Sequence, residues 1–97
     1  MKDERTYIVT YDIADARRWR SVFKTMNGFG EWLQLSVFQC RLSRRRREEL
    51  ETRLRELVKK GEDHVLLIDV GPADRTALVV ESIGKTFTAI ERQAVVI

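Results

Sequence analysis

The fold is decided by residues 7–13, which read Tyr-Ile-Val-Thr-Tyr-Asp-Ile. β-Branched and aromatic side chains dominate this stretch, which is typical of a β-strand. Successive side chains of a strand alternate between the two faces of its sheet, so Tyr7 and Tyr11 point away from the face that carries Asp12. We therefore expect residues 6–13 to form a strand with its tyrosines packed in a core or an interface and a carboxylate at its C-terminal end.

Apolar residues spaced by three and four predict two helices. The first is expected over residues 16–27, with Asp15 as its N-cap and an Asn-Gly pair at its end. The second is expected to run from its cap, Ser43, to near Lys60, with Gly61 just beyond the end. The core-facing stripes are Trp19, Val22, Phe23 and Met26 in the first helix, and Leu50, Leu54, Leu57 and Val58 in the second.

The remaining apolar segments predict further strands. Residues 31–42 are extended and long enough for one bent strand or two short ones, and the sequence leaves both open. Residues 64–70 form an almost continuous apolar run, as expected of an interior strand. A Gly-Pro turn follows, and residues 76–83 are expected to form another strand. The apolar tail at residues 94–97 would be unfavourable in water.

This order of elements predicts one α+β domain over residues 1–97. It matches the ferredoxin-like βαββαβ plan, an antiparallel sheet with two helices, here with an extra C-terminal strand. Both helices would cover the same face of the sheet, so the other face would stay exposed unless a second copy docks there. We therefore expect an isologous homodimer in which Ala94–Ile97 packs on the partner subunit and extends its sheet.

Size and composition limit the class of protein. The chain has 97 residues, 43% hydrophobic and 34% charged, which is ordinary for a globular domain. A net charge of +3 is compatible with polyanion binding without establishing it. The single cysteine, Cys40, excludes an intrachain disulfide. No apolar run approaches the roughly 20 residues of a membrane span, and no signal region precedes the first strand. We expect a cytoplasmic protein.

Asp12 is the leading candidate for chemistry. An aspartate at the end of a strand serves either as a turn or capping residue or as a ligand for Mg²⁺ or Mn²⁺. One carboxylate per chain is a poor site for such a cation, but a two-fold axis near this strand would bring two copies together. Asp69 is the best second acid, although a structural role in a turn is favoured for it. With no His or Cys near His64 at metal-ligand spacing, zinc is not expected.

Arginines cluster where each helix begins. Positive charge at a helix N-terminus opposes the helix macrodipole, although a solvated helix face tolerates it. One explanation is a salt-bridged surface, since three arginines of the second cluster precede a glutamate by four residues. The other is contact with nucleic-acid phosphates. Both remain open for Arg44, Arg45, Arg46 and Arg47 in the second cluster. For Arg17, Arg18 and Arg20 in the first cluster, the alternatives are a solvated helix face that tolerates the charge and contact with phosphates.

Several motifs together resemble the second CRISPR-associated core protein family, and the resemblance covers most of the chain. It implies a ferredoxin-like homodimer of the CRISPR adaptation complex, which acquires spacers for antiviral defence, bridges integrase dimers and binds double-stranded prespacer DNA. It also implies a metal-dependent endonuclease with Asp12 at the site. The matching segments are Tyr11-Asp12-Ile13 with the basic residues after it, Gly30 with Gln34-x-Ser36-Val37-Phe38, the charged second helix, and Glu81-Ser82-Ile83-Gly84.

We therefore expect a dimeric scaffold of CRISPR adaptation with Mg²⁺-dependent phosphodiester hydrolysis as a secondary activity. Two alternatives stay open: a stand-alone endoribonuclease of toxin type acting on single-stranded RNA, and a ferredoxin-like nucleic-acid-binding module without chemistry. One departure from the family is Trp32, which occupies a position where the family often has a basic residue. The exchange removes one candidate for binding phosphate, and the indole could instead stack on a base or fill an interface with the integrase.

Overall fold

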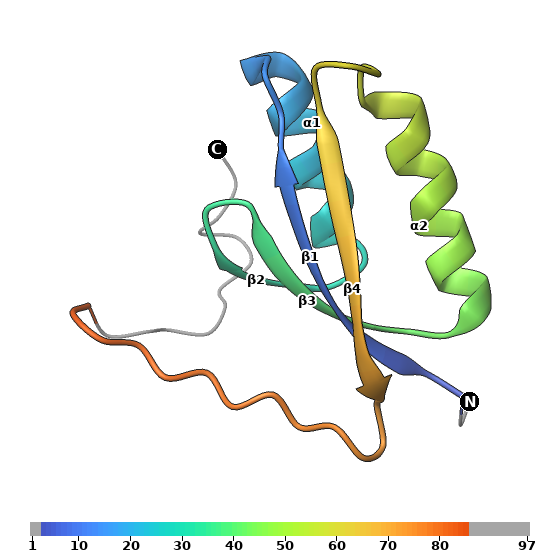
Figure 1. The fold of residues 1–97 in the computed structure, drawn as a ribbon, viewed down its shortest axis with the longest axis vertical. Coiled ribbons are helices and arrows are strands. Elements are labelled where there is room, and N and C mark those ends of the chain that lie inside the picture. Colours follow the sequence, from blue (N-terminus) through green and yellow to red (C-terminus); the bar gives the residue numbers. More distant parts are fainter. Residues whose placement is uncertain (1–2, 86–97) are drawn as a thin grey trace.

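Strand β1 (Arg5–Asp12) lies at the centre of a four-stranded sheet, between β3 (Val37–Leu42) and β4 (His64–Pro72). Strand β2 (Glu31–Gln34) pairs with the outer edge of β3, so the antiparallel order is β2-β3-β1-β4. The computed structural model describes residues 3–85. In Figure 1, helix α1 (Ala16–Asn27) lies behind β1, and helix α2 (Arg44–Leu57) lies to the right of β4. The predicted α+β class with its βαββαβ order is confirmed.

Helix α1 has the predicted bounds and cap. The carboxylate of Asp15 accepts hydrogen bonds from the backbone N–H groups of Arg17 and Arg18, each at 3.0 Å. These bonds satisfy two of the donors that the first turn leaves without partners. The predicted apolar stripe faces the sheet: Val22, Phe23 and Met26 are buried, and Trp19 packs against the core.

Helix α2 begins as predicted but ends earlier. The Ser43 hydroxyl accepts a hydrogen bond from the Arg46 N–H at 3.1 Å, which confirms the cap. The helix stops at Leu57 because Val58 already has extended backbone angles, with φ −80° and ψ 155°. The expected end near Lys60, with Gly61 just beyond it, is therefore wrong. Gly61 adopts a φ of 91° in the turn that leads to β4, where glycine is favoured.

The segment 31–42 forms two strands rather than one bent strand. Leu35 has a φ of 41° in the tight turn between them, a left-handed conformation that breaks the strand. The indole N–H of Trp32 donates to the Leu35 carbonyl at 2.9 Å, and its ring meets Phe23 edge-on at 6.0 Å. Trp32 thus stabilises the hairpin and its packing on α1.

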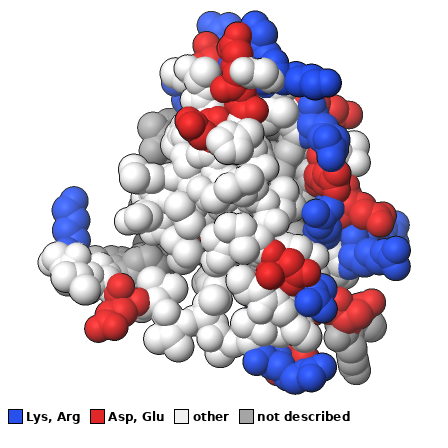
Figure 2. All heavy atoms as spheres, in the orientation of Figure 1, with Lys and Arg blue, Asp and Glu red and all other residues white. Residues whose placement is uncertain are grey.

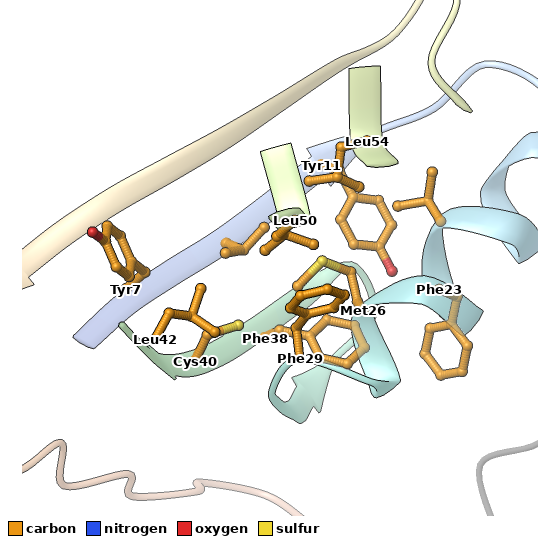
Figure 3. Close-up of a cluster of buried hydrophobic side chains, with 12 residues drawn as sticks. Tyr7, Tyr11, Phe23, Met26, Phe29, Phe38, Cys40, Leu42, Leu50 and Leu54 are labelled. Atoms are coloured by element: carbon orange, nitrogen blue, oxygen red, sulfur yellow. The ribbon is translucent and has the colours of Figure 1, made fainter. Parts of the chain in front are cut away.

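The hydrophobic core fills the space between the sheet and the helices (Figure 3). Tyr7, Val9 and Tyr11 point into it from β1, and their exposed fractions are 7%, 0% and 6%. The Tyr11 ring lies 6.2 Å from Trp19 and 6.3 Å from Phe38. Core packing of both tyrosines is therefore confirmed. The other buried apolar side chains are Val22, Phe23, Met26, Phe29, Phe38, Cys40, Leu42, Leu50 and Leu54.

The opposite face of the sheet is covered by neither helix. The register places Ile68 opposite Ile8 and Leu66 opposite Thr10, on the face that Val9 and Tyr11 do not share. Leu66 and Ile68 remain 49% and 45% exposed. Figure 2 shows this face as a broad uncharged area with charged side chains around its rim. We call it the helix-free face.

The strand expected over residues 76–83 is wrong for the described chain. These residues leave the end of β4 and run beyond the sheet (Figure 1), and none of them is assigned to a strand. A strand needs a hydrogen-bonding partner along its length, and residues 76–83 pair with neither edge strand, β2 or β4. The predicted strand at residues 94–97 lies outside the described residues. No helix between residues 3 and 85 has the length and apolar character needed to cross a membrane.

We predict that Gly30→Ala destabilises the fold. A Cβ at Gly30 would lie 2.4 Å from the Cys40 sulfur and 2.5 Å from the Gln39 carbonyl oxygen, so the hairpin would have to shift. Such overpacking costs roughly 1–3 kcal/mol, which should lower the thermal midpoint by about 4 °C or more at fixed protein concentration. Gly28→Ala is the control, because its Cβ would meet only the Thr25 carbonyl oxygen at 3.4 Å. Equal melting of the two variants would contradict this prediction.

Candidate functional site

Asp12 lies at the C-terminal end of β1 and is exposed, on the side of the helix-free face. The antiparallel register places it directly opposite His64, the first residue of β4. Opposed residues in such a pair have Cβ atoms about 4.5–5.5 Å apart. That His64 lies beside Asp12 could not be predicted from the sequence, because it depends on the register of β1 against β4.

The described residues of one chain do not complete a metal site. Between residues 3 and 85, no group of three or more His, Cys, Asp or Glu side chains is placed to hold a metal ion. Asp69, the best second acid from the sequence, lies opposite Tyr7, far along β4 from His64. It is ion-paired with Arg5 at 2.9 Å and accepts a hydrogen bond from the Gly71 N–H, so its role is structural. Asp12 offers the oxygen chemistry that Mg²⁺ prefers, but as a single ligand.

A buried carboxylate anchors the loop that follows Asp12. The Asp63 side chain is fully buried. It accepts hydrogen bonds from the Ala14 N–H at 2.9 Å, from the Lys59 N–H at 2.8 Å, and from the Arg18 Nε at 2.7 Å. The Arg18 hydrogen bond, together with the two backbone donors and the guanidinium charge, holds the pKa of the Asp63 carboxyl far below its usual range, against the opposing effect of burial. Nothing in the sequence distinguished Asp63 from other loop acids.

The first arginine cluster is divided between two roles. Arg18 is paired with Asp63 and also reaches Glu62 at 3.2 Å. Arg17 and Arg20 are exposed, and no ion pair is observed for either within the described residues. Lys24 lies on the same helical face at the following turn, opposite the buried stripe, and is likewise exposed. We call Arg17, Arg20 and Lys24 the α1 basic stripe.

Most arginines of the second cluster are neutralised by glutamates of the same helix. Arg47 pairs with Glu51, and Arg44 with Glu48 at 3.7 Å, as their spacing predicts. Glu49, which follows Arg45 by four residues, is instead contacted by Arg46 at 2.8 Å and by Arg53 at 3.3 Å. Along α2 in Figure 2, blue and red side chains therefore alternate. The structure favours the salt-bridged interpretation for this helix.

Arg46 also has a structural role that its spacing did not predict. Its guanidinium lies 4.1 Å from the centre of the Phe29 ring and donates to the Gly28 carbonyl oxygen at 3.1 Å. It therefore links the start of α2 to the end of α1 through a cation–π contact and a hydrogen bond. Arg45 is exposed, and no ion pair is observed for it in the described part of the chain.

Two polar core residues are unsuited to nucleophilic catalysis. Burial raises the pKa of the Cys40 thiol to about 12, helped by the charge of Glu31, so the reactive thiolate does not form near neutral pH. Burial likewise raises the pKa of the Tyr11 hydroxyl. The expected packing of Cys40 within a strand is confirmed by its exposed fraction of 1%. The exposed groups at the end of β1 are therefore better placed for chemistry.

Comparison with known proteins gives consistent matches over most of the chain. The family model described as CRISPR associated protein Cas2 matches residues 5–77. The CRISPR-associated endoribonuclease Cas2 of Geobacter sulfurreducens is 58% identical over 94 residues, covering 97% of this chain and 99% of the relative. The CRISPR-associated endoribonuclease Cas2 1 of Rhodospirillum rubrum is 55% identical over 94 residues, covering 97% of this chain and 92% of the relative.

Solved structures agree with these matches. A crystal structure described as cas2 superposes with a TM-score of 0.71 at 32% identity, covering 91% of this chain and 98% of the other. A protein of Thermus thermophilus described as hypothetical superposes with a TM-score of 0.73 at 34% identity, covering 90% of this chain and 99% of the other. The likeness therefore extends through nearly the whole length of these relatives.

We predict that Asp63 makes folding stability depend on acidity. Folding lowers the pKa of this carboxyl, so its contribution is fully present above the pKa of about 4 that it has in the unfolded chain. The contribution should fall as the pH is lowered below that value. Urea unfolding of the wild type and of Asp63→Asn, measured between pH 2 and 7, should give a difference in free energy of unfolding that is constant above about pH 5 and shrinks below about pH 4. A difference that stays constant to pH 2 would contradict this assignment.

Proposed function

The chain belongs to the Cas2 family of CRISPR-associated proteins, and from this premise we propose that it is a dimeric scaffold of the CRISPR adaptation complex. In this role it binds the phosphate backbone of a prespacer duplex and bridges two dimers of the CRISPR integrase. The observation that carries the proposal is the separation of its surfaces. An uncharged sheet face is available for a second copy, and unpaired cations lie on α1 for nucleic acid.

The homodimer is proposed on the helix-free face. Its exposed apolar side chains lie on β4, and a small domain gains stability when such a surface is buried. A two-fold axis across this face makes the same residues meet their own copies. An axis that passes near the C-terminal end of β1 would also bring the two copies of Asp12 together. The exposed apolar side chains on β4 are Leu66, Ile68 and Val70, and the segment that follows the sheet adds Leu78, Val79, Val80 and Ile83.

We predict that Ile68→Glu converts the dimer into a monomer. The substitution places a charge at the middle of the helix-free face, where burial in an interface would leave it without a partner. Light scattering at micromolar concentration should give a dimer mass for the wild type and a monomer mass for the variant. Leu35→Glu is the matched control, because Leu35 is 74% exposed in the β2–β3 turn and should not affect association. A monomeric wild type, or a dimeric Ile68→Glu, would refute the proposed interface.

The nucleic-acid surface is proposed on the α1 basic stripe. A cation whose charge is already compensated by a nearby carboxylate gains less from a phosphate than a free one does, because the existing ion pair must be given up. Arg17, Arg20 and Lys24 lie on one face of α1, and no ion pair to a carboxylate is observed for them among the described residues. Arg45 adds one free cation at the start of α2. Binding to phosphates neutralises the backbone without reading sequence, as a scaffold for varied spacers requires.

We predict a difference between two triple variants with equal change of charge. Replacing Arg17, Arg20 and Lys24 by Gln should reduce the slope of log K against log salt by about 0.9 for each phosphate that is no longer neutralised, or nearly three in all. Replacing Arg47, Arg53 and Arg55 by Gln should change the slope by less than one, because these side chains pair with Glu49 and Glu51. Fluorescence anisotropy with two unrelated duplexes measures both. Equal slopes for the two variants would contradict the assignment to α1.

Phosphodiester hydrolysis at Asp12 is the second proposed activity. Two relatives bear the name endoribonuclease, and Asp12 is an exposed oxygen ligand at the end of a central strand. Asp12 would hold the Mg²⁺ or Mn²⁺ ion, whose charge would polarise a phosphoryl oxygen of the substrate. One chain contributes a single carboxylate, so the second copy, the phosphate and water must complete the ligand set. Two alternatives remain: a stand-alone ribonuclease and a non-catalytic binding module. The cleavage assay on Asp12→Asn and the duplex-binding assay on the arginine variants distinguish them from the proposed scaffold.

We predict that Asp12→Asn abolishes this hydrolysis without altering the fold or the dimer. The amide keeps the shape of the side chain but loses the charge that a hard cation requires. Cleavage of labelled single-stranded RNA and of duplex DNA, with Mg²⁺ and with EDTA, should show activity only for the wild type with metal. Equal cleavage by purified Asp12→Asn would assign the activity to other residues or to a contaminant.

A further inference from the structure

The loop between Asp12 and α1 is hydrogen-bonded to the side chain of a residue far away in the sequence. It consists of Ile13, Ala14 and Asp15, and each residue is engaged differently. Ile13 packs against the core, and Asp15 caps α1. Ala14 donates its backbone N–H to Asp63, which comes from the turn preceding β4. Asp63 is thus distant from the loop in the sequence but accepts a hydrogen bond directly from its backbone.

We infer that Asp63 is a positioning residue for Asp12. Its carboxylate binds the chain that follows Asp12 at two points. One is the Ala14 N–H within the loop, and the other is the Arg18 guanidinium in the first turn of α1. The Lys59 N–H, bonded to the same carboxylate, ties this arrangement to the end of α2. This inference rests on the proposed hydrolysis at Asp12 and adds the residue that holds its geometry.

The geometry makes this carboxylate difficult to replace. One oxygen accepts from Ala14 N and Arg18 Nη2, at 2.9 and 3.2 Å, and the other accepts from Arg18 Nε and Lys59 N, at 2.7 and 2.8 Å. Four donors thus converge on the two oxygens of a carboxylate that is itself fully buried. An asparagine at this position would turn an NH₂ group toward two of these donors, and a buried N–H without an acceptor is costly. The loop would relieve this conflict by moving, and Asp12 lies two residues from Ala14.

The inference also changes the expected role of Arg18. Its guanidinium is directed at Asp63 and Glu62, and its side chain is only 26% exposed. An arginine engaged in this way is a structural cation, whereas Arg17 and Arg20 on either side of it remain exposed. We therefore assign Arg18 to the positioning of the loop rather than to phosphate binding.

A second ion pair on β4 provides a matched control. Asp69 pairs with Arg5 through both carboxylate oxygens, at 3.0 and 2.9 Å, and accepts from the Gly71 N–H. The chemistry resembles that of Asp63 and Arg18, but this pair is partly exposed and lies at the opposite end of β1 from Asp12. Asp63→Asn and Asp69→Asn therefore make the same change of charge at the two ends of one strand pair.

The test measures loop order and catalysis in four proteins: wild type, Asp63→Asn, Asp69→Asn and Asp12→Asn. Amide hydrogen exchange by NMR reports the protection of the Ala14 N–H, and single-stranded RNA cleavage gives kcat and KM. In Asp63→Asn we expect faster exchange at Ala14, a kcat lower by about ten-fold or more, and a KM within about three-fold of wild type. In Asp69→Asn we expect Ala14 protection and kcat within about two-fold of wild type. Arg18→Lys, which keeps the charge but loses the paired donors, should give a smaller loss in the same direction and replaces Asp63→Asn should that variant not fold.

Three outcomes overturn the inference that Asp63 positions Asp12. Only the third also overturns the proposed hydrolysis. A kcat in Asp63→Asn equal to that of Asp69→Asn, with Ala14 exposed to exchange, shows that the loop moves without consequence for catalysis. Unchanged Ala14 protection in Asp63→Asn shows that the carboxylate does not hold the loop. Both leave the proposed hydrolysis intact if Asp12→Asn is inactive. Wild-type cleavage by Asp12→Asn, or no cleavage by the wild type, removes the proposed hydrolysis and with it the catalytic role of Asp63.

Discussion

The alternation of side chains along β1 is the constraint on which the rest of the molecule depends. Because β1 pairs with β3 on one side and β4 on the other, its side chains have only the two faces of the sheet to occupy. Tyr7, Val9 and Tyr11 occupy the face that the helices cover. Ile8 and Asp12 are thereby placed on the side of the helix-free face. A shift of one residue in the register would exchange the two sets and remove the core and the site together.

The local elements could be predicted from the sequence because each is determined by neighbouring residues. Asp15 and Ser43 cap the helices as expected, and the 3.6-residue period identifies the buried side of α1. The end of α2 was missed because it depends on the backbone of Val58, which no helix-ending residue marks. The expected strand at residues 76–83 failed for a different reason. Its apolar, β-branched composition favours a strand, but the segment pairs with neither edge of the described sheet, β2 or β4.

The site was less predictable, since it is assembled by contacts between distant residues. Asp12 was identified by its place at the end of a strand. Its neighbour His64 and the anchor Asp63 depend on how β4 pairs with β1, which the sequence does not specify. The two arginine clusters look alike in sequence and differ in the fold. Glutamates of the same helix neutralise most of the α2 cluster, whereas Arg17 and Arg20 project from α1 without acidic partners among the described residues. Spacing alone therefore overestimates the charge available to a nucleic acid.

The central claim, that in spacer acquisition this protein acts through its surfaces rather than through Asp12, is tested most directly by spacer integration. The assay combines the protein with its integrase, a prespacer duplex and a target array, and measures integrated product. The account predicts near wild-type integration with Asp12→Asn. It predicts a loss of about ten-fold or more when Arg17, Arg20 and Lys24 are replaced by Gln, because the duplex is no longer held. Loss of integration with Asp12→Asn, together with normal integration by the triple variant, would contradict the scaffold role and favour a catalytic one.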